Sequence, residues 1–487
     1  MASAEERSPT DAEDDDPIRI SVGDAIGAIG FGRGQVALLI VCGLGFSADA
    51  AEIGYISYVV KELRTSWGLT ESEVVGLEQA VFAGQILGAL VWGRVADRCG
   101  RRPAFLYSTL LITVCGYLTM IAQNIHHLLI IRAGVGFGVS GLFLCVDVMA
   151  EMVAEEHRGK TTMAIQYFWP LGSVYTLFCT RFFLEAYGWR VLTFFAALPT
   201  TMALILGYAI LPESPRWLVD ENRNKEAARE IKKLARKNKI SIKFDEILAP
   251  HHTAEIGCGS LLQKRKYRGS LLLLLITWFS FGLGYNGILL ATPSILSKEA
   301  KEHSPLNASM TTEDTDTDAG GLNFDYRALA ISTGGEFLAV TAGMLLVDTW
   351  GRRPLQWLFY LSGAVAAIGM GFDSFPYSLI ATAAIICRFS IFAASNGTWT
   401  ITPELFPTEV RGSAHAVCNM FCRFGAITAP IVISEYFSQM GTAALLAAFS
   451  LAAAASSFFL QETKGMDLGD MSDAGEETDS GSDVPLE

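Results

Sequence analysis

The chain has 487 residues, of which 51% are hydrophobic and 18% are charged. This composition is too apolar for a soluble protein of such length and is typical of a protein with many membrane spans. The formal net charge of −13 does not describe the body of the chain, because residues 1–16 and 462–487 carry the acidic excess. Both tails are poor in aromatic residues, so we expect them to be disordered and to lie outside the fold.

Twelve apolar runs follow one another along the chain, six before and six after a long polar insert. Each run is long enough to cross about 30 Å of hydrocarbon as a helix. The predicted spans are 34–60, 73–94, 104–123, 127–150, 162–184, 191–211, 269–297, 326–347, 355–373, 376–401, 413–437 and 440–460. The sequence therefore predicts an all-α membrane protein with twelve transmembrane helices in two six-helix pseudo-repeats.

The same pattern predicts the domain organisation. A disordered acidic tail with a lead-in segment (1–33) precedes the N-terminal six-helix half (34–218). A linker with short amphipathic helices (219–268) connects it to the C-terminal six-helix half (269–461), and a disordered acidic tail (462–487) follows. In the linker, Ala227, Ile231, Leu234 and Ala235 recur at helical spacing among Lys and Arg. Such a helix lies on the inner membrane surface or serves as a solvated connection between the halves.

Lys and Arg are concentrated in loops on one side of the predicted spans. The basic loops contain Arg94, Arg98, Arg101, Arg102, Arg158, Lys160, Arg352 and Arg353, together with residues 223–243. Because basic loops remain in the cytosol, both termini are expected to be cytoplasmic. The loop at 298–325 is then external, where Asn307 in Asn-Ala-Ser is a predicted N-glycosylation site.

Three loop motifs occur twice, about 250 residues apart, which indicates a duplicated membrane unit. Residues 93–103 read Gly-Arg-Val-Ala-Asp-Arg-Cys-Gly-Arg-Arg-Pro, and residues 348–354 read Asp-Thr-Trp-Gly-Arg-Arg-Pro. Glu and Arg-Gly recur at 151–159 and 404–412, and an acidic residue follows the sixth run of each half, at Glu213 and Glu462. Parallel duplication of a six-span unit is an architecture of transporters.

The charged residues of these motifs are predicted to form a cytoplasmic gate, because ion pairs can form in one conformation and break in another. The alternative is that the arginines only hold the loops in the cytosol. The predicted gate residues are Gly93, Arg94, Asp97, Arg98, Gly100, Arg101, Arg102, Glu151, Arg158, Glu213, Arg216, Asp348, Gly351, Arg352, Arg353, Glu404 and Arg411.

Ionisable side chains inside the apolar runs are candidates for the functional site, because charges at membrane depth are costly. Asp49 and Glu52 lie one helical turn apart in the first run, and the second half contributes Glu336, Arg388 and Arg423. Side chains for stacking and hydrogen bonding are Gln166, Tyr167, Trp169, Trp278, Tyr285, Asn286 and Trp399.

Two schemes fit these charges. In the first, Asp49 or Glu52 carries a driving proton while Arg388 or Arg423 holds an anionic carboxylate, and the aromatic side chains clasp its ring. In the second, the acidic pair binds an organic cation directly. A purely structural alternative is that Asp49 pairs with Arg423 to stabilise helix packing.

The duplicated motifs, Pro-Glu-Ser-Pro-Arg-Trp-Leu at 212–218 and Pro-Glu-Leu-Phe-Pro-Thr-Glu-Val-Arg-Gly at 403–412 resemble the major facilitator superfamily, in its sugar and organic-ion porter branch. Within that branch, the segments 30–35, 47–52, 336–337 and 420–426 resemble synaptic vesicle 2-related proteins and nicotinate transporters. Arg181 departs from the small or apolar residue that this resemblance implies. The resemblance implies transport of a small charged aromatic such as nicotinate or its methylated relative.

We therefore expect a secondary active transporter that moves a small organic ion by alternating access and is coupled to protons. No Gly-x-x-x-x-Gly-Lys-Ser/Thr motif occurs in the sequence, so direct use of ATP is not expected. No enzyme activity, cofactor, metal or nucleic-acid partner is expected, and the protein is expected to be monomeric in the plasma membrane or an internal vesicle or vacuole membrane. The alternatives are a sugar-type uniporter and a transporter-like receptor or scaffold that no longer transports.

Overall fold

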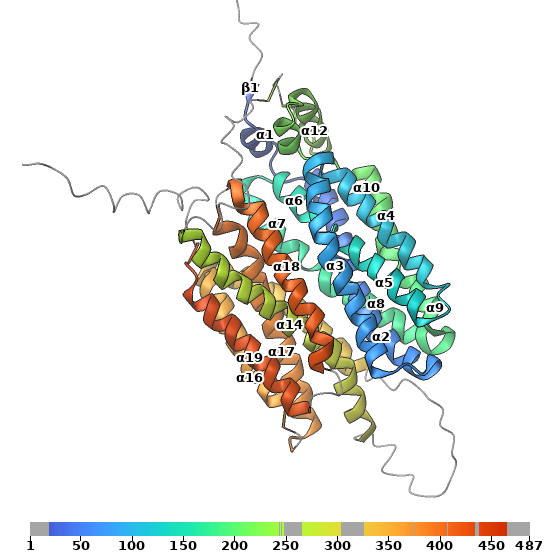
Figure 1. Ribbon diagram of the computed structural model, residues 1–487. Coiled ribbons are helices and arrows are strands. Elements are labelled where there is room, and N and C mark those ends of the chain that lie inside the picture. The colour runs from blue at the N-terminus through green and yellow to red at the C-terminus, as the bar shows by residue number, and fades with distance from the viewer. Residues whose placement is uncertain are drawn as a thin grey trace, which may run out of the picture.

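The computed structural model describes residues 19–242, 244, 246–247, 265–302, 326–372, 374–406, 408–433 and 438–464. This part of the chain is almost entirely helical. The exceptions are two short strands, β1 (Arg19–Ile20) and β2 (Glu246–Ile247), which pair in parallel. The long helices form two bundles that lie side by side (Figure 1).

The first bundle contains the helices before the linker. They are α2 (Arg33–Trp67), α3 (Glu71–Cys99), α4 (Arg101–Thr119), α5 (Ile125–Val139), α6 (Leu144–Glu151), α7 (Glu155–Ile165), α8 (Phe168–Cys179), the π-helical η1 (Thr180–Leu184), α9 (Glu185–Ala196) and α10 (Leu198–Ile210). Pro170 explains the break between α7 and α8, because its ring excludes a hydrogen bond to the carbonyl of Gln166. Gly188, at a φ of 76°, reverses the chain within α9.

The second bundle contains α14 (Arg265–Glu302), α15 (Tyr326–Trp350), α16 (Arg352–Met370), α17 (Tyr377–Glu404), α18 (Thr408–Ile433) and α19 (Gln439–Phe459). Each of the twelve predicted spans corresponds to one helix or to consecutive helices. Eight helical stretches of the described chain are long and apolar enough to cross a membrane, and one of them, Met163–Ile210, covers the fifth and sixth predicted spans. The third, fourth and ninth spans correspond to α4, α5 with α6, and α16, which are shorter or interrupted.

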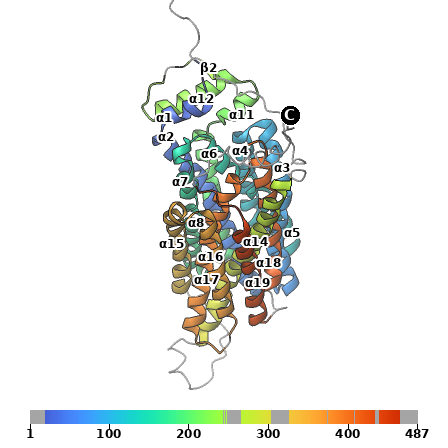
Figure 2. The same cartoon turned by 90° about the vertical axis from the view of Figure 1, so that its left-hand side faces the viewer.

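A cap of short helices covers one end of the first bundle (Figure 2). It consists of α1 (Val22–Ile29), α11 (Pro215–Asp220) and α12 (Asn224–Lys237). The apolar face of α12, which includes Ile231 and Leu234, packs against α1 and the start of α2, and the backbone N–H of Gly34 donates to Asn238 Oδ1 at 2.8 Å.

This packing bears on two expectations. Within the predicted unit 1–33, a tail with a lead-in segment, the part from residue 19 onward is folded against the first bundle. The apolar face of the linker helix is covered by protein, so it is not the membrane-facing surface that its amphipathic pattern allowed. The tails 1–18 and 465–487 lie outside the described residues.

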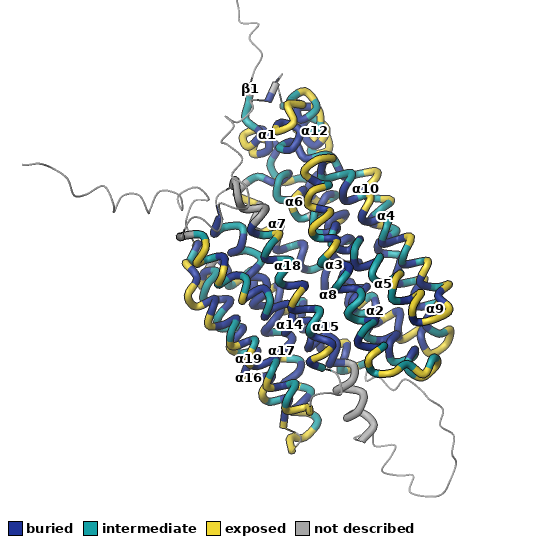
Figure 3. Tube along the Cα trace, in the orientation of Figure 1, coloured by how far each residue is buried: buried dark blue, intermediate teal, exposed yellow. Residues whose placement is uncertain are grey.

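Buried residues lie where the helices face one another, while exposed positions lie on the outward faces of both bundles (Figure 3). Many exposed positions are large and apolar, among them Leu87, Ile130, Tyr208 and Leu338. That surface is suited to lipid rather than to water. Close helix packing recurs in both bundles: a Cβ on Gly172 would lie 2.1 Å from Ser47 O, and a Cβ on Gly425 would lie 2.1 Å from Phe279 O.

Candidate functional site

A small cavity lies between the two bundles, near the middle of the long helices. Its volume is about 30 Å³, which is room for about one or two water molecules and excludes an organic ligand. The lining residues are Phe46, Ile53, Phe143, Gln166, Trp169, Phe281, Tyr285, Asn286, Phe392, Trp399, Asn419, Cys422 and Arg423. The two bundles must therefore move apart before a small organic molecule can enter.

Aromatic rings form most of the cavity wall. Phe143 stacks on Trp399 with ring centroids 5.6 Å apart, and Phe46 packs edge-on against Trp169 at 5.4 Å. Phe143, the residue before α6, and Phe46 of α2 both contact Trp399 of α17, so the aromatic wall joins the two bundles. Trp278 lies behind this wall, 4.7 Å from the ring of Trp399, and does not line the cavity.

Arg423 of α18 is the charged residue that lines this cavity. Its guanidinium lies 4.8 Å above the ring of Phe143, and its Nη2 is 3.6 Å from Oδ2 of Asp49 in α2. Of the ion pairs between described side chains, this pair joins the two bundles. A separation of 3.6 Å exceeds the 2.7–2.9 Å typical of charge-assisted hydrogen bonds, so the attraction is chiefly Coulombic.

The remaining partner of the Asp49 carboxylate comes from α3. Gln85 Nε2 donates to Asp49 Oδ1 at 3.5 Å, and Gln85 is itself fully buried. The other carboxylate oxygen, Oδ2, makes no hydrogen bond among the described residues. The pair of Asp49 and Arg423 considered from the sequence is thus present. The carboxylate of Asp49 has only long contacts and is incompletely hydrogen-bonded by the described residues.

Two further buried ion pairs lie within single bundles. Glu52 accepts from Arg132 Nη1 at 2.5 Å, and the guanidinium of Arg132 lies 4.6 Å from the ring of Tyr55. In the second bundle, Arg388 Nε donates to Glu336 Oε1 at 2.7 Å. All four side chains are at most 3% exposed. Neither pair has to break when the bundles separate.

The sequence analysis missed Arg132. The signal was available, because Arg132 is a basic residue within the apolar run 127–150 and the rule that selected Arg388 applies to it equally. Glu52 and Asp49 lie one helical turn apart but have different arginine partners. Glu52 pairs with Arg132 of the same bundle, whereas Asp49 pairs with Arg423 of the other bundle.

A chain of hydrogen bonds links the first bundle to the Glu336–Arg388 pair. Trp169 Nε1 donates to Tyr285 OH at 2.5 Å, and Tyr285 OH donates to Glu336 Oε1 at 2.6 Å. Gln166 lies at the break between α7 and α8, and Trp169 lies in the first turn of α8, beside Pro170. Tyr167, at the same break, bonds to Thr341 of α15 and faces away from the cavity. Gln166, Tyr285, Asn286, Trp399 and Arg423 line the cavity as a group.

The repeated loop motifs build the same cluster at the start of α4 and at the start of α16. Glu213 Oε1 accepts from the backbone N–H of Arg101 at 2.8 Å and of Arg102 at 3.2 Å. Gly100, at a φ of 101°, makes the turn before α4, and a Cβ there would lie 2.2 Å from Glu213 Oε2. A carboxylate at a helix N-terminus satisfies unpaired N–H groups and complements the helix dipole. Burial nevertheless raises the pKa of the Glu213 carboxyl, against the effect of these N–H groups.

The second copy has the same geometry. Glu462 accepts from the backbone N–H of Arg352 at 2.9 Å and of Arg353 at 3.0 Å, and Gly351 has a φ of 97°. The side chains repeat as well: Arg101 lies 3.9 Å from Glu151, and Arg352 lies 3.2 Å from Glu404. The hydroxyl of Ser214 donates to Glu151, and the hydroxyl of Thr463 donates to Glu404.

These described loop-end ion pairs lie within one bundle each. Asp97 is 76% exposed and lies 3.8 Å from Arg101 of the same bundle. Arg94 donates to the carbonyl of Leu90, Arg102 donates to the carbonyl of Tyr208, and Gly93 and Arg98 are exposed at the end of α3. Arg216 lies in α11 and is half-buried. The side chains of Arg158, Asp348 and Arg411 lie outside the part of the chain that the structure describes, as does Asn307.

Comparison with known proteins assigns the chain to a family. The profile of the "Sugar (and other) transporter" family matches residues 36–474. The chain belongs to this family. It is 28% identical to the synaptic vesicle 2-related protein of Xenopus laevis, over 92% of this chain and 82% of the relative. It is 26% identical to organic cation/carnitine transporter 7 of Arabidopsis thaliana, over 85% of this chain and 88% of the relative.

The fold of this family member is also that of solved transporters. The structure of the proton:xylose symporter XylE, a major facilitator superfamily protein bound to 6-bromo-6-deoxy-D-glucose, aligns with a TM-score of 0.68 and 19% identity, over 90% of this chain and 98% of the other. A partially occluded inward-open structure of XylE from E. coli aligns with a TM-score of 0.67 and 21% identity, over 89% and 99%. The predicted fold class, twelve helices of the major facilitator type, is confirmed. The protein is a multi-pass membrane transporter of this superfamily with a small-molecule substrate, and it is not an enzyme.

Proposed function

We propose that this transporter is a secondary active carrier of a small organic anion and is coupled to protons. The observation that carries the proposal is the Asp49–Arg423 pair, which combines a charge on the cavity wall with a carboxylate from the opposite bundle. The halves 34–218 and 269–461 are proposed to rock about this cavity in alternating access.

Arg423 is proposed to hold the negative group of the substrate. Its guanidinium is the cationic group on an otherwise aromatic and amide-lined wall, and it can form a bidentate pair with a carboxylate. Phe143 and Trp399 supply flat faces for a ring, and Asn286 and Gln166 supply hydrogen-bonding groups. These features support the first of the two schemes, with Arg423 rather than Arg388 as the anion site, because Arg388 is engaged by Glu336 away from the cavity wall.

Asp49 is proposed to carry the proton. When Asp49 is ionised it neutralises Arg423, and a substrate carboxylate must compete with it. When Asp49 is protonated, Arg423 loses its counter-ion and the substrate carboxylate replaces it, so proton and anion are favoured together. The loaded site then has the same net charge as the empty site. Symport follows from this equivalence, because unpaired charge at membrane depth is costly.

The Glu52–Arg132 and Glu336–Arg388 pairs are proposed to remain intact through the cycle. Each lies within one bundle at a short separation, so rigid rocking leaves both undisturbed. Glu336 adds a link between the bundles through Tyr285 and Trp169, which must break when the bundles part. In this account, Asp49 is the coupling group and Glu52 is a structural one.

A second candidate substrate is an organic cation. The aromatic wall offers ring faces that attract quaternary ammonium groups, and one relative is described as an organic cation/carnitine transporter. The positive charge of Arg423 on the same wall opposes a simple cation, so this substrate requires Asp49 to neutralise that arginine throughout. A passive sugar uniporter leaves the Asp49–Arg423 pair between the bundles without a coupling role, and so does a non-transporting receptor.

The remaining assignments concern topology and gating. We propose that both termini are cytoplasmic, that the protein acts as a monomer in the plasma membrane or an internal vesicle membrane, and that the two loop-end clusters form the cytoplasmic gate. The distribution of Lys and Arg supports the orientation. The duplicated geometry of the clusters supports a role common to both halves.

Uptake into proteoliposomes tests the proposed substrate class. Radiolabelled nicotinate is offered with the outside acidified, and aromatic carboxylates, organic cations and sugars are added as competitors. The proposal predicts uptake that aromatic carboxylates suppress, with at least about a tenfold loss of affinity in Arg423→Gln. Arg132→Gln is unsuitable as a control, because it leaves the buried Glu52 without its counter-ion. Arg229→Gln removes an exposed arginine from α12, is the matched surface control and should leave uptake unchanged. Uptake of cations alone would overturn the anion assignment.

A further inference from the structure

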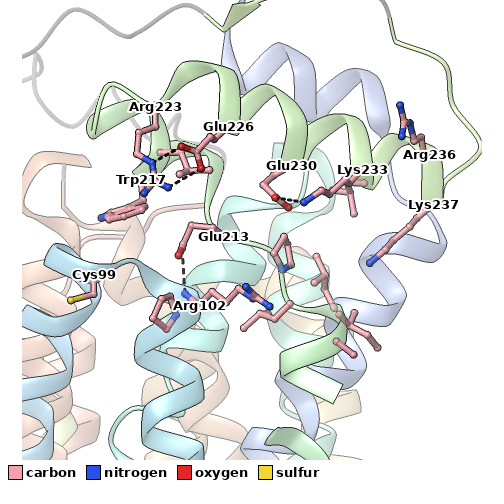
Figure 4. A pocket seen from close by; sticks show the side chains of 18 residues that line it. Cys99, Arg102, Glu213, Trp217, Arg223, Glu226, Glu230, Lys233, Arg236 and Lys237 are labelled. Carbon is pink, nitrogen blue, oxygen red and sulfur yellow. Dashed lines mark hydrogen bonds and ion pairs between the residues drawn. The ribbon is translucent and has the colours of Figure 1, made fainter. Parts of the chain in front are cut away.

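A second, larger hollow lies at the end of the first bundle, between the cap and the bundle itself. Its volume is about 690 Å³, within the range of ligand-binding pockets. Figure 4 shows α12 along one side, with the start of α4 and the segment after α10 along the other. This hollow is separate from the central cavity and shares no lining residue with it.

The acidic side chains of this hollow already have partners. Glu226 is bonded by Arg223 at 2.9 and 2.7 Å, and Glu230 is bonded by Lys233 at 2.5 Å. Glu213 accepts from the backbone N–H groups at the start of α4. The carboxylates are therefore not left to neutralise the other basic groups.

Three basic side chains of the lining have no carboxylate partner among the described residues, namely Arg102, Arg236 and Lys237. Arg102 Nη2 donates to the carbonyl of Tyr208 at 2.8 Å, while its Nε is buried and has no hydrogen-bond partner in the described chain. Buried donors of this kind are costly to leave unmade. The hollow thus has surplus positive charge and at least one unsatisfied donor.

The other side of the hollow is apolar. Leu38, Pro103 and Ile210 belong to its lining, at the ends of the long helices α2, α4 and α10. Below them, Tyr208 and Ile205 of α10 are 71% and 57% exposed, and Ile40 of α2 is 44% exposed. A ligand held at the hollow can therefore continue along an apolar, outward-facing surface. A charged head with an apolar tail fits this arrangement better than a freely soluble anion.

We propose that this hollow binds the phosphorylated headgroup of an anionic glycerophospholipid, with Arg102 and Lys237 contacting phosphate and the acyl chains lying along α2 and α10. Basic groups attract the anionic lipids of the cytoplasmic leaflet, and the arginine distribution predicts that this end of the bundle is cytoplasmic. A lipid held here contacts α12, α4 and α10 at once and so fastens the cap to the first bundle.

Native mass spectrometry of the full-length protein in detergent tests the proposal. Dioctanoyl phosphatidylinositol 4-phosphate, dioctanoyl phosphatidylcholine and soluble inositol 1,4-bisphosphate are titrated separately. The anionic lipid is expected to be retained, while phosphatidylcholine and the soluble headgroup bind at least about tenfold more weakly. Lys237→Gln is expected to weaken the anionic lipid about tenfold, and Arg102→Gln similarly. Arg229→Gln, which removes an equal charge from an exposed position of α12 outside the lining, is the matched control and leaves binding unchanged.

Each contrary result has a clear meaning. Equal binding of inositol 1,4-bisphosphate and the lipid overturns the lipid assignment in favour of a soluble anion. Equal losses in Lys237→Gln and Arg229→Gln overturn the site, because the attraction is then a general effect of basic charge. Lys237 is at the end of α12, and its side chain makes no hydrogen bond or ion pair with the described residues. Its variant therefore keeps the test valid even if Arg102→Gln unfolds the cap.

Discussion

Replacing Glu336 by Gln tests whether the Glu336–Arg388 pair is structural. The substitution leaves the guanidinium of Arg388, which is 3% exposed, without its counter-ion, and weakens the acceptor of Tyr285 OH. Removing one partner of a buried pair costs about 3–5 kcal/mol. For a cooperative unit the size of one six-helix half, this corresponds to a fall in the melting midpoint of roughly 10 °C.

The double variant Glu336→Leu with Arg388→Met tests whether the loss of stability comes from the unpaired charge of Arg388. Replacing a whole buried pair by apolar side chains of similar size is often neutral or stabilising by about 1–4 kcal/mol, so most of the loss in Glu336→Gln should be recovered. The assay is thermal unfolding of the detergent-purified protein followed by fluorescence-detected size exclusion. Arg223→Gln, which breaks an exposed pair on α12, is the control and should leave the midpoint unchanged. A double variant as unstable as Glu336→Gln, or a single variant as stable as the wild type, would refute this reasoning.

Three further predictions concern the loop-end clusters. Gly351→Ala should lower the melting midpoint, because a side chain at a φ of 97° is strained and its Cβ would lie 2.7 Å from Glu462 Oε2. Gly334→Ala is the control, since the space at its Cβ is open and its φ is not positive. Equal midpoints for the two variants would contradict the strain argument. Asp97→Asn should slow transport while surface expression is unchanged, if the clusters form the gate; normal uptake would remove Asp97 from it. In Glu213→Gln, the stability relative to the wild type should increase as pH rises from 4.5 through the raised pKa of the folded protein. The reason is that the folded wild type binds this proton more tightly than the unfolded chain and loses that stability as the carboxyl ionises. A stability difference independent of pH, measured by thermal unfolding across this range, would contradict it.

The fold followed largely from patterns that are local in the chain. The Gly-Arg-Arg-Pro repeats predicted where α4 and α16 begin, and the apolar runs between them predicted the spans. Apolar runs predict spans reliably because the bilayer requires each span to be long, apolar and helical, whatever helices lie next to it. The helix α1 was missed for the opposite reason: its eight residues are held by contacts with α12, about 200 residues away, and no local pattern encodes such a contact.

The candidate site was less accessible to sequence reasoning. Burial rules selected Asp49, Glu52, Glu336, Arg388 and Arg423, but the partners of each depend on how helices pack. Arg132 was overlooked although its position in an apolar run was visible. The sequence could not distinguish the pair that joins the bundles from those within one bundle, and this distinction now separates Asp49 from Glu52.

The central claim is that Asp49 carries one proton with each substrate anion. Proteoliposomes are loaded with a pH-sensitive dye, nicotinate is added outside with no imposed gradient, and internal pH is recorded for the wild type, Asp49→Asn and Arg229→Gln. The account predicts internal acidification with the wild type and Arg229→Gln, and none with Asp49→Asn even where nicotinate exchange persists. Nicotinate entry without acidification in the wild type, or acidification that persists in Asp49→Asn, would contradict it.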